Sequence, residues 1–267
     1  MFAGIDIGSV TTKAVIVNQK GEIEIFVKLP TLSDRNQSGE DVLTLALNRI
    51  NRSSEDIQFV VSTGYGRRSF ISSDKALPEI ICHAKGTISL FPDAKTIMDI
   101  GGQDSKAIEL DEHGNVSKFE MNDKCAAGTG RFLEVLTERI LNISLDELGP
   151  ISLRSQNPCT LSSVCTVFAE SEIISLLSEK RSREDIAYGL HMAIAKRVIG
   201  MGTGGSISFR EPIIFSGGVA KNIGVIKAIE TILGKKVITP EEPQITAALG
   251  AAIFARDSGK ARASASL

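Results

Sequence analysis

A short internal repeat constrains the fold of this 267-residue chain more than any other feature of its sequence. Residues 6–15 read DIGSVTTKAV and residues 99–108 read DIGGQDSKAI, so Asp, Ile, Gly, Lys and Ala recur in the same places. In each copy an apolar run precedes the glycine and another follows the lysine, which predicts a strand, a tight turn and a second strand. The chain therefore presents one β-hairpin twice, as a tandem duplication of a domain would.

Strand and helix patterns alternate along the rest of the chain. Alternating apolar residues predict strands at residues 22–29 and 115–121, and helical spacing predicts helices at 41–50, 132–140, 168–177, 186–199, 224–232 and 245–254. This alternation is typical of α/β architecture, and the duplication predicts two similar α/β domains that face one another across a cleft. We expect these domains at residues 1–92 and 93–255, because Phe-Pro-Asp at 91–93 interrupts a helical pattern. The small, polar segment 256–267 is expected to be a disordered tail.

The composition argues against several functional classes. Thirty Lys and Arg residues against 32 Asp and Glu residues leave a net charge of −2, too balanced for a protein that binds nucleic acid or an acidic membrane surface. Aromatic residues make up 5% of the chain, and no apolar run approaches the ~20 residues that cross a bilayer. Four cysteines are too few for a disulfide framework. We therefore expect a cytoplasmic protein with neither nucleic acid nor membrane as a partner.

The two hairpins predict phosphate binding. Gly8 in the first turn, and Gly101 and Gly102 in the second, let backbone N–H groups approach an anion closely. Asp6 and Asp99 have the chemistry to hold a hydrated Mg²⁺ ion or to orient an attacking water. The first turn adds further donors, namely Ser9, Thr11, Thr12 and Lys13. Two facing hairpins would clamp a triphosphate, although isolated glycine turns also occur as plain structural features.

A third glycine segment follows a predicted strand and precedes a helix. Residues 215–222 read FSGGVAKN, and Gly217 and Gly218 allow the backbone to lie flat against a purine or ribose. In this order behind the two hairpins, the segment, with Asn222 at its end, resembles the adenosine motif of the actin, Hsp70 and sugar-kinase superfamily. The alanine-rich helix around residues 247–252 resembles the connecting helix of that superfamily, and Gln244 just ahead of it is a candidate for the same pocket.

Cys125 and Cys165 lie in sequence contexts that such a fold does not require. Each precedes a helical pattern, and a helix N-terminus stabilises the thiolate, which is the form that ligates metals. Two thiolates per chain do not saturate a [4Fe–4S] cluster, but a two-fold dimer would supply four. A four-sulfur zinc site and two plain buried thiols remain as alternatives, and spacing alone favours the buried thiols. Cys82 is expected in the core, and Cys159 is expected to be a spare thiol on a loop.

A family resemblance decides among these alternatives. The strings that carry it are DIGGQD at 99–104, NDKCAAGTGRFL at 122–133, CTVFAESE at 165–172 and GGVAKN at 217–222. They resemble the activator (component A) family of 2-hydroxyacyl-CoA dehydratases and the related ATPase subunits of benzoyl-CoA reductase. The resemblance runs from about Gly4 to Ala255.

This resemblance implies a homodimer with one [4Fe–4S] cluster, bridged by Cys125 and Cys165 of both subunits. Each subunit would bind one MgATP, with Asp6 and Asp99 serving Mg²⁺ and water, and Gln103 and Asp104 near the γ-phosphate. The exchange of ATP for ADP would change the domain closure. The protein would take one electron from ferredoxin or flavodoxin and pass it to a partner iron–sulfur dehydratase or reductase.

Two rival interpretations use the same fold. One is a small-molecule kinase of the superfamily, which would leave Cys125 and Cys165 without a purpose. The other is an ATP-switched scaffold without redox function.

Overall fold

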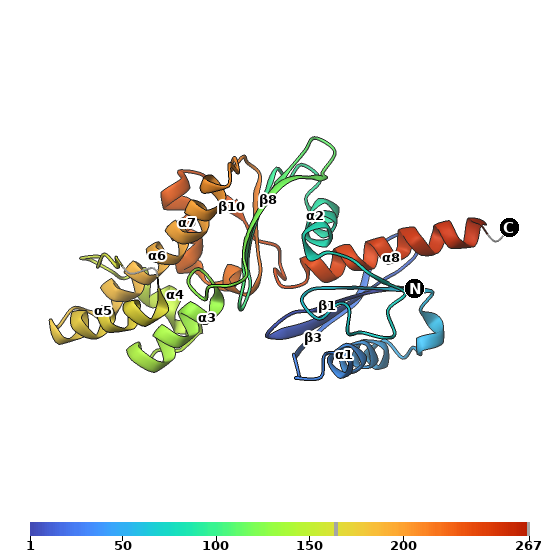
Figure 1. Cartoon of the computed structure of the whole chain (residues 1–267), viewed down its shortest axis with the longest axis horizontal. Helices are drawn as coiled ribbons and strands as arrows, with labels where there is room; N and C mark the ends of the chain where they lie inside the picture. The colour runs from blue at the N-terminus through green and yellow to red at the C-terminus, as the bar shows by residue number, and fades with distance from the viewer. Residues whose placement is uncertain (163–164, 266–267) are drawn as a thin grey trace. The chain divides into compact units, whose positions relative to one another are not determined.

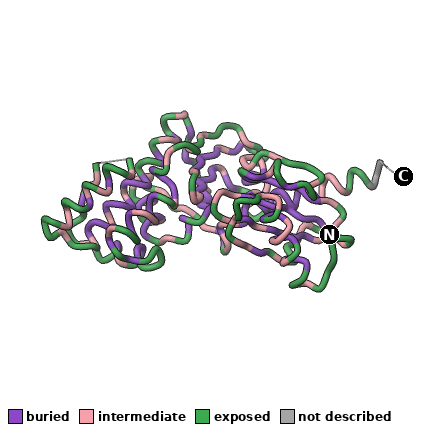
Figure 2. Tube along the Cα trace, turned by 60° about the horizontal axis from the view of Figure 1, so that its bottom comes forward, coloured by how far each residue is buried: buried purple, intermediate pink, exposed green. Residues whose placement is uncertain are grey.

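The structure is a computed structural model that describes residues 1–162 and 165–265, and its contacts divide the chain into two units. Unit 1 comprises Met1–Ala94, Leu110–Val116 and Gln244–Leu267, and unit 2 comprises Lys95–Glu109 and Ser117–Pro243. From the sequence, the second domain is expected to extend to residue 255. In the structure, the chain from Gln244 onward belongs to unit 1. Figure 2 shows the buried segments as purple stretches inside each unit.

Unit 1 is built on a mixed sheet with the strand order β3-β2-β1-β4-β5. Its strands are β1 (Phe2–Ile7), β2 (Thr11–Val17), β3 (Ile23–Pro30), β4 (Phe59–Thr63) and β5 (Lys75–Ala76). Its helices are α1 (Arg35–Arg49), η1 (Ser54–Asp56), α2 (Glu79–Leu90) and α8 (Thr246–Ala265). The first predicted hairpin is confirmed as the antiparallel pair β1–β2, and β4 pairs with β1 in parallel.

Alternation along β1 gives this sheet two buried faces. Phe2 packs into a cluster with residues of α8, whereas Ile5 and Ile7 pack into a second cluster with residues of α1 such as Val42. Helices α1 and α8 therefore cover opposite faces of the sheet, as Figure 1 shows. The strands that carry the first hairpin are held on both sides by apolar packing.

Small residues bring α8 close to its neighbour α2. A Cβ atom on Gly250 of α8 would overlap the Cys82 carbonyl, and one on Gly86 of α2 would overlap the Thr246 carbonyl. The absence of a side chain at Gly250 and Gly86 therefore allows the two helix backbones to approach closely.

The expected disordered tail is instead a continuation of α8 as far as Ala265. Polar contacts hold this part of the helix: Arg256 Nη1 donates to the Lys20 carbonyl at 2.9 Å, and Lys85 Nζ lies 3.1 Å from Asp257 Oδ2. The sequence pattern missed them because the partners are far away along the chain. Residues 266 and 267 of the expected tail lie outside the described residues.

Unit 2 repeats the sheet of unit 1, with the strand order β8-β7-β6-β9-β10. Its strands are β6 (Thr96–Ile100), β7 (Ser105–Leu110), β8 (Val116–Asn122), β9 (Ile213–Ser216) and β10 (Val237–Ile238). Its helices are α3 (Gly130–Glu134), which continues into the π-helical turn η2 (Val135–Leu141), α4 (Leu145–Ser152), α5 (Thr166–Ser178), α6 (Arg183–Gly204), η3 (Gly218–Lys221) and α7 (Ile223–Leu233). Within the described residues, no helix is both long and apolar enough to cross a membrane.

The buried core of unit 2 contains one histidine with an unusual environment. His191 on α6 is 1% exposed, and its Nδ1 lies 2.9 Å from the Ser152 hydroxyl. That hydroxyl donates its hydrogen to the Gly149 carbonyl at 2.7 Å, so Nδ1 of His191 must be the donor toward Ser152. Nε2 then carries no proton and has no hydrogen-bond partner among the described residues.

This histidine predicts a loss of stability in mild acid. Burial lowers the pKa of His191 to about 4 from its usual 6.5, so the unfolded chain binds this proton at a higher pH than the folded chain. The free energy of unfolding is therefore highest above pH 6.5 and falls as the pH is lowered toward 4. Between pH 7.5 and pH 5 it should fall by about 2 kcal/mol because of this histidine. Urea unfolding at both pH values should show this difference for the wild type and a smaller one for His191→Asn. Equal differences in the two proteins would contradict the assignment.

Candidate functional site

The two hairpins are built in the same way. In the strand register Asp6 pairs with Lys13, and Asp99 pairs with Lys106. Each turn closes with the same backbone hydrogen bond, from Gly8 N–H to the carbonyl of residue 11 at 3.1 Å and from Gly101 N–H to the carbonyl of residue 104 at 2.9 Å. The duplication in the sequence is therefore a duplication of geometry.

In the first hairpin, one oxygen of Asp6 is paired and the other is not. Asp6 is 4% exposed at the end of β1, and Lys13 Nζ donates to its Oδ2 at 3.0 Å. Oδ1 is buried and has no hydrogen-bond partner among the described residues. Burial raises the pKa of Asp6, and the positive charge of Lys13 opposes that rise. A buried carboxylate oxygen without a protein partner suits a cation or a bound water.

Gly64 leaves the space beside that oxygen open. It follows β4, has a φ of +84°, and a Cβ atom here would overlap Asp6 Oδ1 and lie 2.7 Å from the Ile7 carbonyl. Gly66 N–H donates to the same Ile7 carbonyl at 2.8 Å, which fixes the loop against the end of β1. Local sequence pattern does not identify Gly64 as a site residue, because its contact with Asp6 is formed only by the pairing of β4 with β1.

The hydroxyl residues of the first turn separate into two groups. Ser9 and Thr11 are half-buried, so their hydroxyls remain near the surface of the turn. Thr12 is completely buried, and its hydroxyl lies 2.9 Å from that of Thr31 on the neighbouring segment. Lys13 is paired with Asp6, so its charge orients that carboxylate.

In the second hairpin, both oxygens of Asp99 have partners. Asp99 is 3% exposed, with Ser216 Oγ donating to Oδ1 at 2.9 Å and Lys106 Nζ donating to Oδ2 at 3.1 Å. Lys106 is itself buried and also donates to Asp104 Oδ2 at 2.7 Å. Asp104 is therefore tied to Asp99 through one lysine, while Gln103 at the tip of the turn is exposed. Ser216 is a further site residue, which lies outside the repeated motif and reaches Asp99 from β9.

The third glycine segment packs against the second hairpin. Gly217 has a φ of +89°, and a Cβ atom here would overlap the Ile100 carbonyl. Gly218 is exposed, and Asn222 caps α7 by accepting from Gly224 N–H at 2.9 Å and from the next amide. Gln244, in unit 1, accepts from Lys28 Nζ at 3.0 Å. Asn222 and Gln244 thus have protein partners, and their proposed roles toward adenosine would be additional to these contacts.

The cysteines divide into two buried and two accessible thiols. Cys82 is completely buried, and burial raises the pKa of its thiol to about 12. Cys159 is 6% exposed, and burial raises the pKa of this thiol as well. Cys165 is exposed and is the N-cap residue of α5, and Cys125 is half-buried on the loop between β8 and α3. The core position expected for Cys82 is confirmed, and Cys159 packs into the core of unit 2 rather than standing free on its loop.

The loop of Cys125 differs from the sequence expectation in one respect. Helix α3 begins at Gly130, and its first amides are not free to face a thiolate. Gly130 N–H donates to the Gly101 carbonyl at 2.8 Å, and Arg131 N–H donates to the Gly102 carbonyl at 2.9 Å. Spacing along the chain could not show that the second hairpin turn supplies these acceptors.

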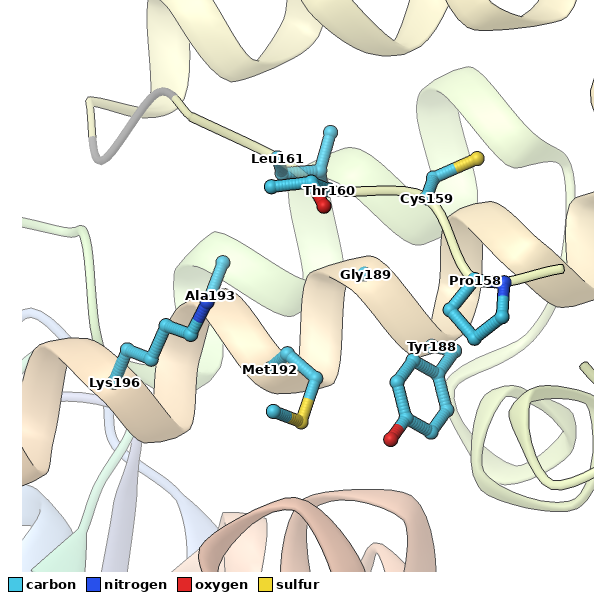
Figure 3. A pocket seen from close by; sticks show the side chains of 9 residues that line it. All are labelled: Pro158, Cys159, Thr160, Leu161, Tyr188, Gly189, Met192, Ala193 and Lys196. Carbon is cyan, nitrogen blue, oxygen red and sulfur yellow. The ribbon is translucent and has the colours of Figure 1, made fainter. Parts of the chain in front are cut away.

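A pocket lies elsewhere in unit 2, between the loop 158–161 and α6 (Figure 3). Its cavity volume is about 130 Å³, and the residues that line it include Cys159, Tyr188, Met192 and Lys196. The lining contains none of the residues predicted to bind nucleotide or a cluster, so we do not assign this pocket to either function.

Comparison with known families decides where this chain belongs. A family model described as "BadF/BadG/BcrA/BcrD ATPase family" matches residues 3–255, which include both hairpins and both accessible cysteines. The chain belongs to this ATPase family. The resemblance to dehydratase activators that the sequence motifs indicated is therefore confirmed.

Individual relatives agree with this assignment. The activator of lactoyl-CoA dehydratase from Anaerotignum propionicum is 44% identical over 96% of this chain and 98% of its own length. The solved structure of the activator of 2-hydroxyisocaproyl-CoA dehydratase from Clostridium difficile, with bound ADPNP, has a TM-score of 0.92 at 42% identity, covering 99% of this chain and 97% of that one. A benzoyl-CoA reductase subunit from Thauera aromatica is 31% identical over 94% of this chain and 92% of its own length.

A more distant likeness confirms the fold class alone. A glucokinase of the ROK family from Streptomyces griseus has a TM-score of 0.57 at 16% identity, covering 96% of this chain and 99% of that one. The chain therefore shares the α/β architecture of that glucokinase. The fold by itself does not distinguish an activator from a kinase.

Within this ATPase, Gly64→Ala is expected to lower both stability and ATP hydrolysis. The left-handed backbone at Gly64 costs a Cβ-bearing residue about 1–3 kcal/mol of unfolding free energy, and the added Cβ displaces Asp6 Oδ1. Gly234→Ala is the matched control, because Gly234 also has a positive φ, +63°, but nothing lies within 4 Å of its Cβ position. Urea unfolding and steady-state ATPase assays should show a stability loss in both variants and an ATPase loss only in Gly64→Ala. Equal ATPase activity in the two variants would contradict the role of Gly64.

Proposed function

We propose that this chain is an ATP-dependent one-electron donor that works as a homodimer with one [4Fe–4S] cluster. Its electron would come from ferredoxin or flavodoxin and would go to a partner iron–sulfur enzyme, such as a 2-hydroxyacyl-CoA dehydratase or a related reductase. The observation that carries the proposal is the division of the thiols: Cys165 is exposed and Cys125 is half-buried at the edge of the core of unit 2, whereas Cys82 and Cys159 are buried. An ATPase that only bound nucleotide would have no need of two accessible thiols ahead of two helices.

The accessible thiols fit an iron–sulfur cluster shared by two subunits. Cys125 and Cys165 are free of disulfides and would hold the cluster together with the same pair from a second copy. When bound, the cluster supplies a single electron whose potential depends on hydrogen bonds to sulfur and on solvent exposure. A one-electron potential changes by 59 mV for about 1.4 kcal/mol, so a few kcal/mol of coupling to ATP would suffice for a large change.

The surface next to Cys165 supports association with a second copy. On α5, which begins directly after Cys165, the side chains of Val167, Phe168 and Ile174 are 68%, 67% and 49% exposed. Large apolar side chains gathered on one short helix mark an interaction surface. A two-fold dimer would bury them and bring the two copies of Cys165 together.

The hairpins supply the groups for ATP hydrolysis. We assign Asp6, whose Oδ1 has no partner within residues 1–162 and 165–265, and Asp99 to Mg²⁺ and the attacking water. The glycine turns at Gly8, Gly101 and Gly102 would bind the phosphates through backbone amides. Ser9 and Thr11 of the first turn would add hydroxyl donors to the phosphates, and Gln103 and Asp104 of the second turn would lie near the γ-phosphate. The phosphate role expected for Thr12 does not agree with its complete burial against Thr31, and Lys13 would act through its pair with Asp6. The ADPNP bound to the activator from Clostridium difficile supports nucleotide binding by this chain, because the two proteins are 42% identical.

Anaerobic purification tests the proposal against its rivals. The expected product is a brown, oxygen-sensitive dimer with iron and acid-labile sulfide in the amounts of one [4Fe–4S] cluster, which reduces its partner only in the presence of MgATP. A colourless protein that phosphorylates a small molecule would support the kinase. A colourless ATPase without a phosphorylated product would support the scaffold.

A further inference from the structure

The loop that carries Cys125, between β8 and α3, is held at its start by hydrogen bonds from one side chain. Asn122, the last residue of β8, donates from Nδ2 to the Cys125 carbonyl at 2.7 Å and to the Ala127 carbonyl at 3.1 Å. Its Oδ1 accepts from Cys125 N–H at 3.2 Å. A single amide side chain therefore fixes the backbone on both sides of the Cys125 sulfur.

The same loop is fastened at its other end to the second hairpin turn. Gly130 N–H and Arg131 N–H donate to the carbonyls of Gly101 and Gly102, the two residues that follow β6 and its Asp99. The contact is close, because a Cβ atom on Gly130 would lie 3.1 Å from the Gly101 carbonyl oxygen. The turn cannot move away without breaking both hydrogen bonds or taking the start of α3 with it.

Between these two ends the loop is stiffened by local contacts. Thr129 donates from both its amide and its hydroxyl to the Ala126 carbonyl, at 3.1 and 2.6 Å. Beyond the loop, Phe132 and Leu133 are each 2% exposed in the core of unit 2, so α3 is anchored by packing. A displacement of the turn is therefore passed along the loop toward Cys125 rather than absorbed by a flexible segment.

We propose that Gly101, Gly102 and Asn122 are positioning residues for Cys125. The two carbonyls hold the Cys125 loop to the turn that we assign to the phosphates, so a shift of that turn on nucleotide binding shifts the loop. The Asn122 amide holds Cys125 to the rest of the loop and to the end of β8. The effect of this shift on a cluster rests on the proposed function. The hydrogen-bonded connection from the turn to the Cys125 loop, here called the linkage, involves only residues of unit 2. ATP and ADP act on Cys125 only to the extent that they contact this turn differently.

Gly130 offers a sharp test of the linkage. It is the first residue of α3, a position that accepts proline, and the residue before it, Thr129, is extended, with φ −126° and ψ 170°, as a residue before proline should be. Gly130→Pro removes the donor to Gly101 and forces that carbonyl away. Gly130→Ala is the control: it keeps the N–H group, and its Cβ atom, 3.1 Å from the Gly101 carbonyl oxygen, requires a shift of only a few tenths of an ångström.

Hydrogen exchange measured by mass spectrometry, with and without Mg²⁺ and a non-hydrolysable ATP analogue, reads out the linkage. In the wild type and in Gly130→Ala, the nucleotide should slow exchange about five-fold or more both in the turn at 99–106 and in the loop at 122–131. In Gly130→Pro the change should be confined to the turn. A wild type without a nucleotide-dependent change at 122–131, or a Gly130→Pro variant that retains it, would overturn the proposal.

A second pair of variants leaves α3 untouched. Asn122→Asp keeps the acceptor for Cys125 N–H but removes the two hydrogen bonds that Asn122 donates. Asp123→Asn is the control, because it changes a carboxylate to an amide at the next residue, which is exposed. We expect the nucleotide-dependent change in the electron paramagnetic resonance spectrum of the reduced dimer to disappear in Asn122→Asp alone, and an unchanged response in that variant would count against Asn122. A preparation without iron that still shows coupled exchange would support the linkage and contradict the proposed function.

Discussion

Replacement of Cys125 by serine is expected to remove essentially all iron from the anaerobically purified protein and to leave nucleotide affinity unchanged. Because the proposed dimer uses each cysteine twice, one substitution removes two of four thiolates, and a serine hydroxyl is a poor substitute for a thiolate on iron. Cys125 is half-buried on a loop, so the change of sulfur to oxygen costs the fold little. Cys165→Ser should have the same effect, since that thiol is exposed at the N-cap of α5.

Iron and sulfide analysis, the visible spectrum and calorimetric titration with MgADP measure this prediction. Cys159→Ala is the matched control, because it also removes one thiol from unit 2, but one that is 6% exposed within the apolar core. Its iron content should equal that of the wild type. If Cys125→Ser kept its iron, or if Cys159→Ala lost its iron equally, the assignment of the ligands would fail.

The parts of the fold that rest on local pattern were predictable from the sequence. The two hairpins follow from runs of neighbouring residues, and the register that pairs Asp6 with Lys13 and Asp99 with Lys106 follows from equal turn lengths. The predicted strands and helices correspond to β3, β8, α1, α3 with η2, α5, α6, α7 and α8. In α6 and α7 the apolar period agrees with the buried residues, whereas Val167, Phe168 and Ile174 of α5 are apolar and yet exposed.

The apolar pattern does not predict helix α4, although the sequence contains a signal for it. Pro150 lies inside this helix and, taken alone, indicates a helix end. Ser144 and Glu147 nevertheless form a capping box at its start, in which the Ser144 hydroxyl accepts from the Glu147 amide. The spacing Ser-x-x-Glu is a local signature of a helix N-terminus and would have predicted α4.

The finer parts of the candidate site depend on contacts between distant segments. Ser216 reaches Asp99 only because β9 pairs with β6, and Gly64 reaches Asp6 only because β4 pairs with β1. The repeat predicted two equivalent aspartates, yet one has an unpartnered oxygen and the other has two protein partners. This difference comes from residues outside the repeat, so the repeat could not reveal it.

The hydrogen bonds around Asp99 make it the better of the two aspartates for a test of hydrolysis. Asp99→Asn removes the negative charge and keeps the shape; Ser216 retains its acceptor at Oδ1, whereas the new amide group faces Lys106 and that hydrogen bond is lost. Lys106 still has the Asp104 carboxylate at 2.7 Å, and the substitution therefore leaves no buried lysine without a counter-ion. Loss of activity in this variant would then report on chemistry rather than on unfolding.

We expect Asp99→Asn to lower the rate of ATP hydrolysis by about 100-fold, equivalent to about 2.7 kcal/mol of transition-state stabilisation, because the carboxylate charge that would serve Mg²⁺ and water is gone. Cluster content and the dimer should be unchanged, since the Cys125 loop is bonded to the carbonyls of Gly101 and Gly102 and not to this side chain. Phosphate release measured alongside iron analysis gives both quantities on one preparation, with Asp93→Asn, an exposed carboxylate just before β6, as the control. Hydrolysis at the wild-type rate would exclude Asp99 from catalysis. Loss of iron together with hydrolysis would instead mean that the charge of Asp99 supports the fold of unit 2.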